Sequence, residues 1–180
     1  MAKLRSSHRE ASVLSKAQDY IRTHVIFPSA LLGIILLVAA TMGLAYQYLA
    51  ETYQPSTFLQ STGLAVVGAL AGWGHSRYQR YLLANFPDAL AAKLDAFLKK
   101  DVTRAKKHGP KPLDHPGRSW MPLVYVLVIL LLLGLAFSAG AWGTVYPVAA
   151  YLLPAAGFFC ARVYAWKDLW GPASSVSSRL

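Results

Sequence analysis

The chain has 180 residues, of which 55% are hydrophobic and only 14% are charged, and its 18 Lys and Arg outnumber its 8 Asp and Glu. This composition excludes a disordered chain and a soluble domain with a charged surface, and it favours a membrane protein. The single cysteine, Cys160, excludes a disulfide framework and a cysteine-based zinc site.

The N-terminal arm, residues 1–27, is polar and is predicted to be helical. Ala17, Tyr20 and Ile21 recur at helical spacing, with charged residues on the other faces. We expect this cytoplasmic amphipathic arm to lie on the membrane surface and to turn into the bilayer near Pro28.

The next segment, residues 28–76, is predicted to form the first transmembrane hairpin. Its first span, Pro28–Ala50, has the roughly 20 apolar residues that a helix needs to cross a hydrocarbon core, and it is longer than the apolar region of a secretory signal. The second span, Thr57–Ser76, is less apolar because glycines and a histidine interrupt it. We still predict that it crosses. Polar residues gather near its start: Gln60, Ser61 and Thr62.

A basic cytoplasmic loop is expected at residues 77–119. It contains an amphipathic helix that begins near Pro87, ends near His108 and carries an apolar stripe that includes Leu90 and Leu94. Such a helix is expected to rest in the membrane interface. Five cations form a candidate site for anionic lipid headgroups, at about 1 kcal/mol each: Lys99, Lys100, Arg104, Lys106 and Lys107. The usual excess of Lys and Arg in cytoplasmic loops explains the same residues equally well.

The second hairpin is predicted at residues 120–166 and a cytoplasmic tail at 167–180. Its first span, Trp120–Ala141, contains no charge. Its second span runs from about Tyr146 to Tyr164, and Pro154 in its middle is expected to kink the helix.

Orientation follows from the positions of Lys and Arg. The N-terminal arm holds 5 of them, the central loop 10 and the C-terminal end 3, whereas the two short connections hold none. This asymmetry predicts that both termini and the loop are cytoplasmic and that the protein resides in a bacterial inner membrane. It also argues against a nucleic-acid partner, because the charges are distributed as a topogenic signal would be.

Small residues in the spans are predicted to pack helices closely. They are Ala39, Gly43, Ala65, Gly68, Gly72, Gly157 and Ala161. Contacts within the chain are favoured, and contacts with a foreign subunit are the alternative. A shift of 85 residues brings Gly72 onto Gly157, so the hairpins could be a parallel repeat. The alternative is that any two short membrane hairpins share such features.

The sequence contains no catalytic or cofactor motif, and none of its predicted spans carries an acid or a base at depth. Intramembrane charges usually mark ion pathways, and their absence argues against a proton-coupled carrier. His75 is expected to be an interfacial polar residue rather than a ligand. His108, Asp114 and His115 lack the spacing of a metal site, so we predict no metal and no cofactor.

The sequence therefore predicts an all-α, polytopic membrane protein with four transmembrane helices in two hairpins. Its predicted function is that of a non-catalytic accessory, assembly or scaffold subunit whose partners are the bilayer and other membrane subunits; self-association is left open. The first alternative is a small channel, carrier or pore inhibitor that uses Pro154 and the polar residues at the start of the second span. The second is an interfacial lipid-modifying enzyme built on His75, Arg77 and Arg80.

Overall fold

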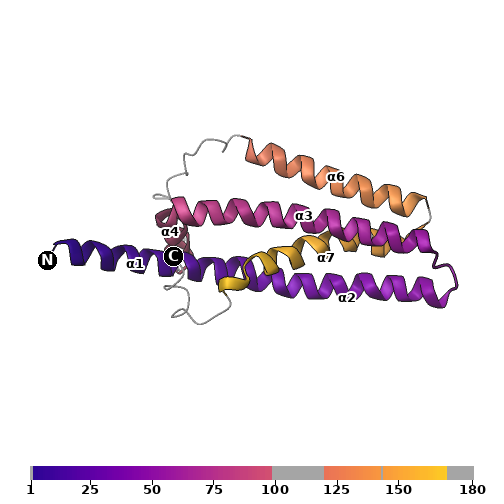
Figure 1. The fold of residues 1–180 in the computed structure, drawn as a ribbon, viewed down its shortest axis with the longest axis horizontal. Coiled ribbons are helices and arrows are strands. Elements are labelled where there is room, and N and C mark those ends of the chain that lie inside the picture. Colours follow the sequence, from indigo (N-terminus) through magenta and orange to yellow (C-terminus); the bar gives the residue numbers. More distant parts are fainter. Residues whose placement is uncertain (1, 99–119, 143, 170–180) are drawn as a thin grey trace.

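The computed structural model describes residues 2–98, 120–142 and 144–169, and within these ranges the chain is helical and contains no strand. The predicted all-α class is therefore confirmed. Figure 1 shows the long helices lying roughly side by side, with the ends of α2 and α6 and the starts of α3 and α7 at one common end.

The N-terminal arm continues into the first predicted span without a turn. Helix α1 (Ala2–Ile21), the π-helical turn η1 (Arg22–Ile26) and α2 (Phe27–Leu49) follow one another as a single long helix (Figure 1). The expected turn near Pro28 was wrong. A proline lacks the N–H of the usual helical bond, and the helix accommodates it with a wider turn, in which the Phe27 N–H bonds the Arg22 carbonyl five residues back.

Helix α3 (Pro55–Asn85) begins where the second span was predicted but ends nine residues beyond Ser76. Its start is fixed by Pro55 in the first turn and by a capping box between Gln54 and Thr57. The helix has 31 residues. At a rise of about 1.5 Å per residue, it is longer than the roughly 30 Å thickness of a hydrocarbon core.

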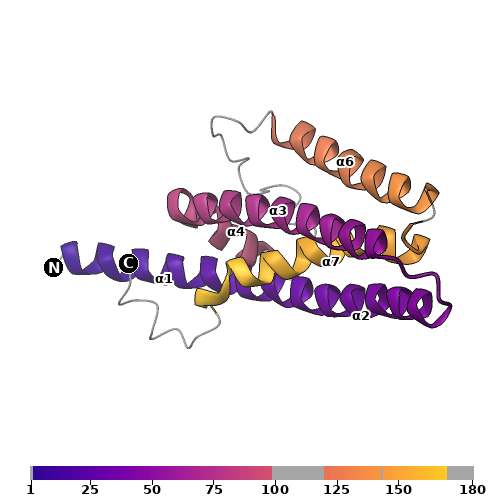
Figure 2. The same cartoon turned by 45° about the vertical axis from the view of Figure 1, so that its right-hand side comes forward.

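Helix α4 (Pro87–Leu98) packs against α1, as Figure 2 shows at the N-terminal side of the bundle. Ala17 and Ile21 of α1 are buried in one cluster with Leu90 of α4 and with Trp166. The apolar stripe of α4 was expected to face the membrane interface. In the described residues it instead packs against the apolar stripe of α1, the helix of the N-terminal arm.

Helix α7 (Pro147–Ala165) is the centre of the bundle. It packs along both α2 and α3 and also contacts α6 (Met121–Ala141), while the short 3₁₀ turn η2 (Lys167–Leu169) follows it. The core between these helices is built mainly of small and aliphatic side chains: Ala40, Leu64, Ala139, Val145, Ala149, Ala150 and Leu153. Pro154 lies inside α7, which remains helical through it.

Three helices of the described chain are long and apolar enough to cross a membrane: Ser12–Leu49, Met121–Ala141 and Pro147–Ala165. Helix α3, which contains the remaining predicted span, is not among them, because hydroxyl, amide and histidine side chains lower its hydropathy. These three apolar helices are consistent with a multi-pass membrane protein. On α6 only Ala136 and Ala139 are buried.

Candidate functional site

The bundle has two chemically different ends. We call the end formed by residues 50–54 and 142–146 the connection end. The opposite end, at which α3 and α7 finish and α6 begins, is called the basic end after its cations Arg77, Arg80, Arg162 and Lys167.

Close packing between α3 and α7 depends on three of the predicted glycines. A Cβ on Gly68 would overlap the backbone of Pro154, one on Gly72 would overlap that of Phe158, and one on Gly157 would overlap that of Ala65. The two backbones are therefore in direct contact, which only glycine permits.

The other predicted packing residues are placed less tightly. A Cβ on Gly43 would meet Tyr146 and Ala149 at 3.3 Å, whereas Ala39 and Ala161 are only partly buried. By contrast, three glycines that were not predicted to pack have no atom within 4 Å of an added Cβ. They are Gly63 and Gly74 on α3 and Gly134 on α6.

Polar side chains hold the connection end together. The backbone N–H of Tyr146 donates to Oε1 of Gln47 at 2.8 Å, and the hydroxyl of Thr57 donates to the Thr144 carbonyl at 2.5 Å. Thr144 in turn donates its hydroxyl to Gln60 Oε1. Gln47 and Thr57 are buried, so α2 and α3 together satisfy the Thr144 carbonyl and the Tyr146 N–H.

Two of the polar residues assigned to the pore alternative thus have local partners. Gln60 belongs to this network, and buried Ser61 donates to the Phe58 carbonyl at 3.0 Å. Thr62 is exposed. The structure does not bring these residues to Pro154, which packs about two turns further along α3 against Gly68.

At the basic end, His75 joins three helices. Its Nδ1 lies 2.6 Å from the hydroxyl of Tyr125 on α6, and its ring packs against the ring of Phe158 on α7 with centroids 5.8 Å apart. The ring is thus held from two sides, by a hydrogen bond and by an aromatic contact.

Arg162 of α7 also belongs to this part of the basic end. It lies one turn before the end of α7, within electrostatic reach of both His75 and Tyr125. Its Nε is buried and has no hydrogen-bond partner, and the same is true of Oε1 of Gln79, one turn after His75 on α3. We call His75, Gln79, Tyr125 and Arg162 the polar cluster.

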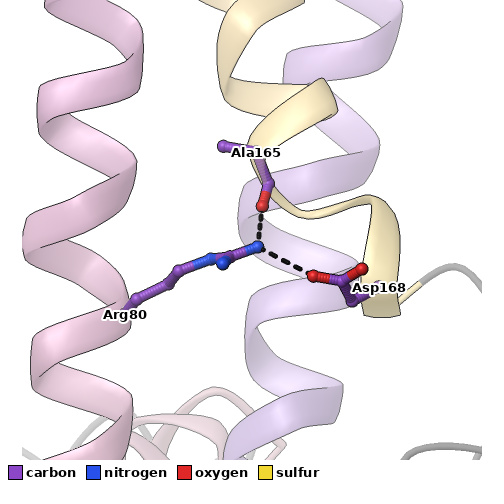
Figure 3. A network of polar contacts seen from close by, with 3 residues as sticks. All are labelled: Arg80, Ala165 and Asp168. Atoms are coloured by element: carbon purple, nitrogen blue, oxygen red, sulfur yellow. Dashed lines mark hydrogen bonds and ion pairs between the residues drawn. The ribbon is translucent and has the colours of Figure 1, made fainter.

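The two arginines that were grouped with His75 in the enzyme alternative have other contacts. Arg77 stacks on Trp73, with its guanidinium carbon 4.8 Å from the ring centroid. Arg80 donates to the Ala165 carbonyl and to the Asp168 carboxylate at 3.2 Å, as Figure 3 shows. It thereby ties α3 to the end of α7.

Two grooves open on the sides of the bundle. One lies between α3 and α6 towards the connection end, where Gln60, Gly63, Val67 and Ser138 are among its lining residues. The other lies between α2 and α7, with Gly33 and Cys160 in its wall.

The remaining predicted sites fall outside the described residues. This applies to the lipid-binding candidates Lys99, Lys100, Arg104, Lys106 and Lys107 and to the histidines and aspartate of the 108–115 segment. The described residues contain no group of three His, Cys, Asp or Glu side chains that could hold a metal ion.

Sequence analysis missed Arg162, Tyr125 and Gln79. Arg162 was counted only as a topogenic charge, although the spacing of Pro154, Phe158 and Arg162 by four residues places all three on one helical face. Since Gly68 and Gly72 contact the first two, that spacing was the available signal that Arg162 faces α3. Tyr125 gave no comparable signal.

Comparison of the chain with protein-family models, with curated proteins and with solved structures gave no match. The class of the protein therefore rests on the fold itself: an all-helical chain with three helices suited to crossing a membrane.

Proposed function

We propose that this chain is a non-catalytic accessory or scaffold subunit of a larger membrane complex, and that it docks a transmembrane helix of another subunit on α3 and α6. The observation that carries the proposal is the open groove between these two helices, in whose wall Gly63 has no atom within 4 Å of an added Cβ.

Helix α3 has two kinds of glycine. Gly68 and Gly72 are used inside the chain against α7, whereas Gly63 and Gly74 face open space. The latter two are eleven residues apart, which is close to three full helical turns, so they lie on one face of α3. Small residues on an exposed membrane face allow another helix to approach closely.

The groove also offers polar groups for recognition. Gln60 and Ser138 are part of its lining, and side-chain hydrogen bonds between membrane helices contribute about 0.6 kcal/mol on average. Helix α6 has an extensive exposed apolar surface beside the groove, which lipid or a partner helix would cover.

The proposed topology has four spans, with α3 as the fourth. Helix α3 supports this because it packs along α7 for much of its length, and a helix beside a span shares its depth. The proposed orientation places the basic end in the cytoplasm of a bacterial inner membrane, because cytoplasmic ends are enriched in Lys and Arg. With Cys160→Ala as background, an impermeant thiol reagent applied outside intact cells should label Ser56→Cys and not Asp88→Cys; the reverse pattern refutes the orientation.

The subunit proposal is tested by purification from the native membrane in mild detergent, with identification of every co-eluting protein. We expect partners in fixed ratio. Gly63→Leu should reduce their recovery at least about fivefold, because the added side chain blocks close approach. The matched control is Ala45→Leu, which adds an apolar side chain at an exposed small residue of α2, away from the proposed docking surface. Equal recovery from both variants, or a wild-type chain that always purifies alone, contradicts the proposal.

A further inference from the structure

We propose that the polar cluster binds the phosphate group of an anionic lipid, with Arg162 as the principal contact. This site is built from other residues than the lysine-rich sequence 99–107, and it lies at the opposite end of the bundle from the α3/α6 groove. The inference does not depend on whether the chain is a subunit of a complex.

The first argument is the state of Arg162. Arg162 is partly exposed, but its Nε is fully buried without a hydrogen-bond partner, and a polar atom of a charged group in that state is costly because its solvation has been lost and no acceptor replaces it. Asp168, the acid closest to Arg162 in sequence, is already engaged by Arg80. Arg162 has no hydrogen bond or ion pair with any other described residue, and its Nε is fully buried. An anion from outside the chain would provide what the fold lacks.

The second argument is the chemistry of the neighbours. When the hydroxyl of Tyr125 donates to Nδ1 of His75, the neutral imidazole carries its proton on Nε2. The Nε2–H is then a hydrogen-bond donor in addition to the guanidinium of Arg162. The planar fork of an arginine matches phosphate oxygens, and charge-assisted hydrogen bonds of this kind are among the strongest in proteins. The aromatic contact with Phe158 holds the imidazole in place.

The third argument is depth. Arg162 lies three residues before the end of α7 and Tyr125 four residues after the start of α6, which is about 5–6 Å from each helix end. Lipid phosphates lie close to this level, just outside the hydrocarbon core. Tyr125 is 37% exposed, so a lipid beside α6 can reach the cluster from the bilayer.

The test uses the purified full chain in phosphatidylcholine membranes that contain traces of spin-labelled lipid. Electron spin resonance then gives the relative association constant of labelled phosphatidylglycerol over labelled phosphatidylcholine. The measurement is made in 0.5 M NaCl, because high salt screens exposed charges far more than buried ones. We expect clear selectivity for the anionic lipid in the wild type.

The decisive variant is Arg162→Gln, with Arg77→Gln as the matched control that removes an equal charge from the exposed surface of the same end. Arg162→Gln should reduce selectivity by about tenfold, the loss of one charge-assisted hydrogen-bonded contact, and Arg77→Gln should leave it within about twofold. Arg162→Lys should recover only part of it, because the ammonium lacks the planar fork. Circular dichroism verifies that each variant is helical; if Arg162→Gln does not fold, the comparison of Arg162→Lys with the wild type decides.

Four results would overturn the proposal. The first is a wild type without selectivity, and the second is an equal loss in Arg162→Gln and Arg77→Gln, which would reduce the effect to surface charge. The third is unchanged selectivity in Arg162→Gln together with lost recovery of a partner protein, which would assign Arg162 to a partner carboxylate. Displacement of the labelled lipid by 50 mM inorganic phosphate, at constant ionic strength, would assign the cluster to a soluble phosphate compound and refute the lipid as its source.

Discussion

The hydroxyl of Tyr125 lies 2.6 Å from Nδ1 of His75, and this hydrogen bond joins α6 to α3 at the basic end. Helix α6 buries only two residues, both in its C-terminal half. The Tyr125–His75 bond is therefore a polar anchor for the half of α6 that has no buried side chain of its own.

Replacing Tyr125 by Phe should destabilise the folded protein by about 0.5–1.5 kcal/mol, the usual net value of one hydrogen bond within a protein or between membrane helices. The ring remains, so its aromatic contact with His75 is retained. The measurement is reversible unfolding in mixed detergent micelles of increasing denaturing detergent content.

The matched control is Tyr151→Phe, which removes a hydroxyl from a partly exposed tyrosine of α7. It should change the free energy of unfolding by less than about 0.5 kcal/mol, as surface substitutions usually do. Equal losses in the two variants would show that the His75 contact contributes nothing specific.

The glycine contacts between α3 and α7 give a second prediction. Gly68→Ala should destabilise by about 2–4 kcal/mol, because the methyl group would overlap the Pro154 backbone and overpacking of this kind forces helices apart. Gly63→Ala should instead leave stability unchanged or raise it by up to about 1 kcal/mol, since its surroundings are open and alanine favours the helix.

Both alanine variants are measured in the same detergent titration. A neutral Gly68→Ala would mean that α3 and α7 are further apart than the structure shows. A destabilising Gly63→Ala would mean that the open face of α3 is covered even in the purified chain, for example by a second copy.

The connection end provides a third prediction. Gln47→Ala should cost about 2–3 kcal/mol, because it removes side-chain hydrogen bonds, leaves the Tyr146 N–H without its partner and opens space at a buried position. Gln47→Met keeps most of the volume and loses only the polar contacts, so it should cost less, about 1–2 kcal/mol. A methionine variant as stable as the wild type would show that water replaces the lost bonds.

The helices were largely predictable, because an uncharged apolar run of about 20 residues is typical of a membrane-spanning helix. The predicted spans Pro28–Ala50 and Trp120–Ala141 correspond within one residue at each end to α2 and α6. The second predicted span ended at Ser76, where the apolar character of the sequence ends, whereas helix α3 continues to Asn85, because a helix outside the hydrocarbon does not need apolar side chains. The prediction failed at Pro28 because a π turn absorbed the proline.

The polar cluster was less accessible from sequence for a different reason. Its hydrogen bond joins residues 50 positions apart, and their contact depends on how α6 and α3 are placed around α7. The positive-inside rule already accounted for Arg162, so no local feature required it to face inward. Only its spacing from Phe158, read together with the glycines of α3, indicates that orientation.

The turn after α2 supports a final prediction, in which a substitution stabilises the protein. Glu51 has a φ of 56°, in the left-handed region, and is the one described residue other than glycine with a positive φ. Its N–H bonds the Tyr48 carbonyl at 3.1 Å and the N–H of Thr52 bonds the Gln47 carbonyl at 3.1 Å. These are the two hydrogen bonds of a helix-ending Schellman motif, whose left-handed position is most often glycine.

Glu51→Gly should therefore raise the free energy of unfolding by about 0.5–1 kcal/mol, because relief of the left-handed conformation outweighs the greater freedom of glycine in the unfolded chain. Glu51→Ala is the control, since it removes the same charge and keeps the Cβ that causes the strain; it should give no gain. Equal stabilisation by both variants would attribute the effect to charge rather than backbone conformation. Destabilisation by both variants would show that the Glu51 carboxylate itself makes a stabilising contact, whereas destabilisation by Glu51→Gly alone would show that the freedom of glycine in the unfolded chain outweighs the relief of the left-handed conformation.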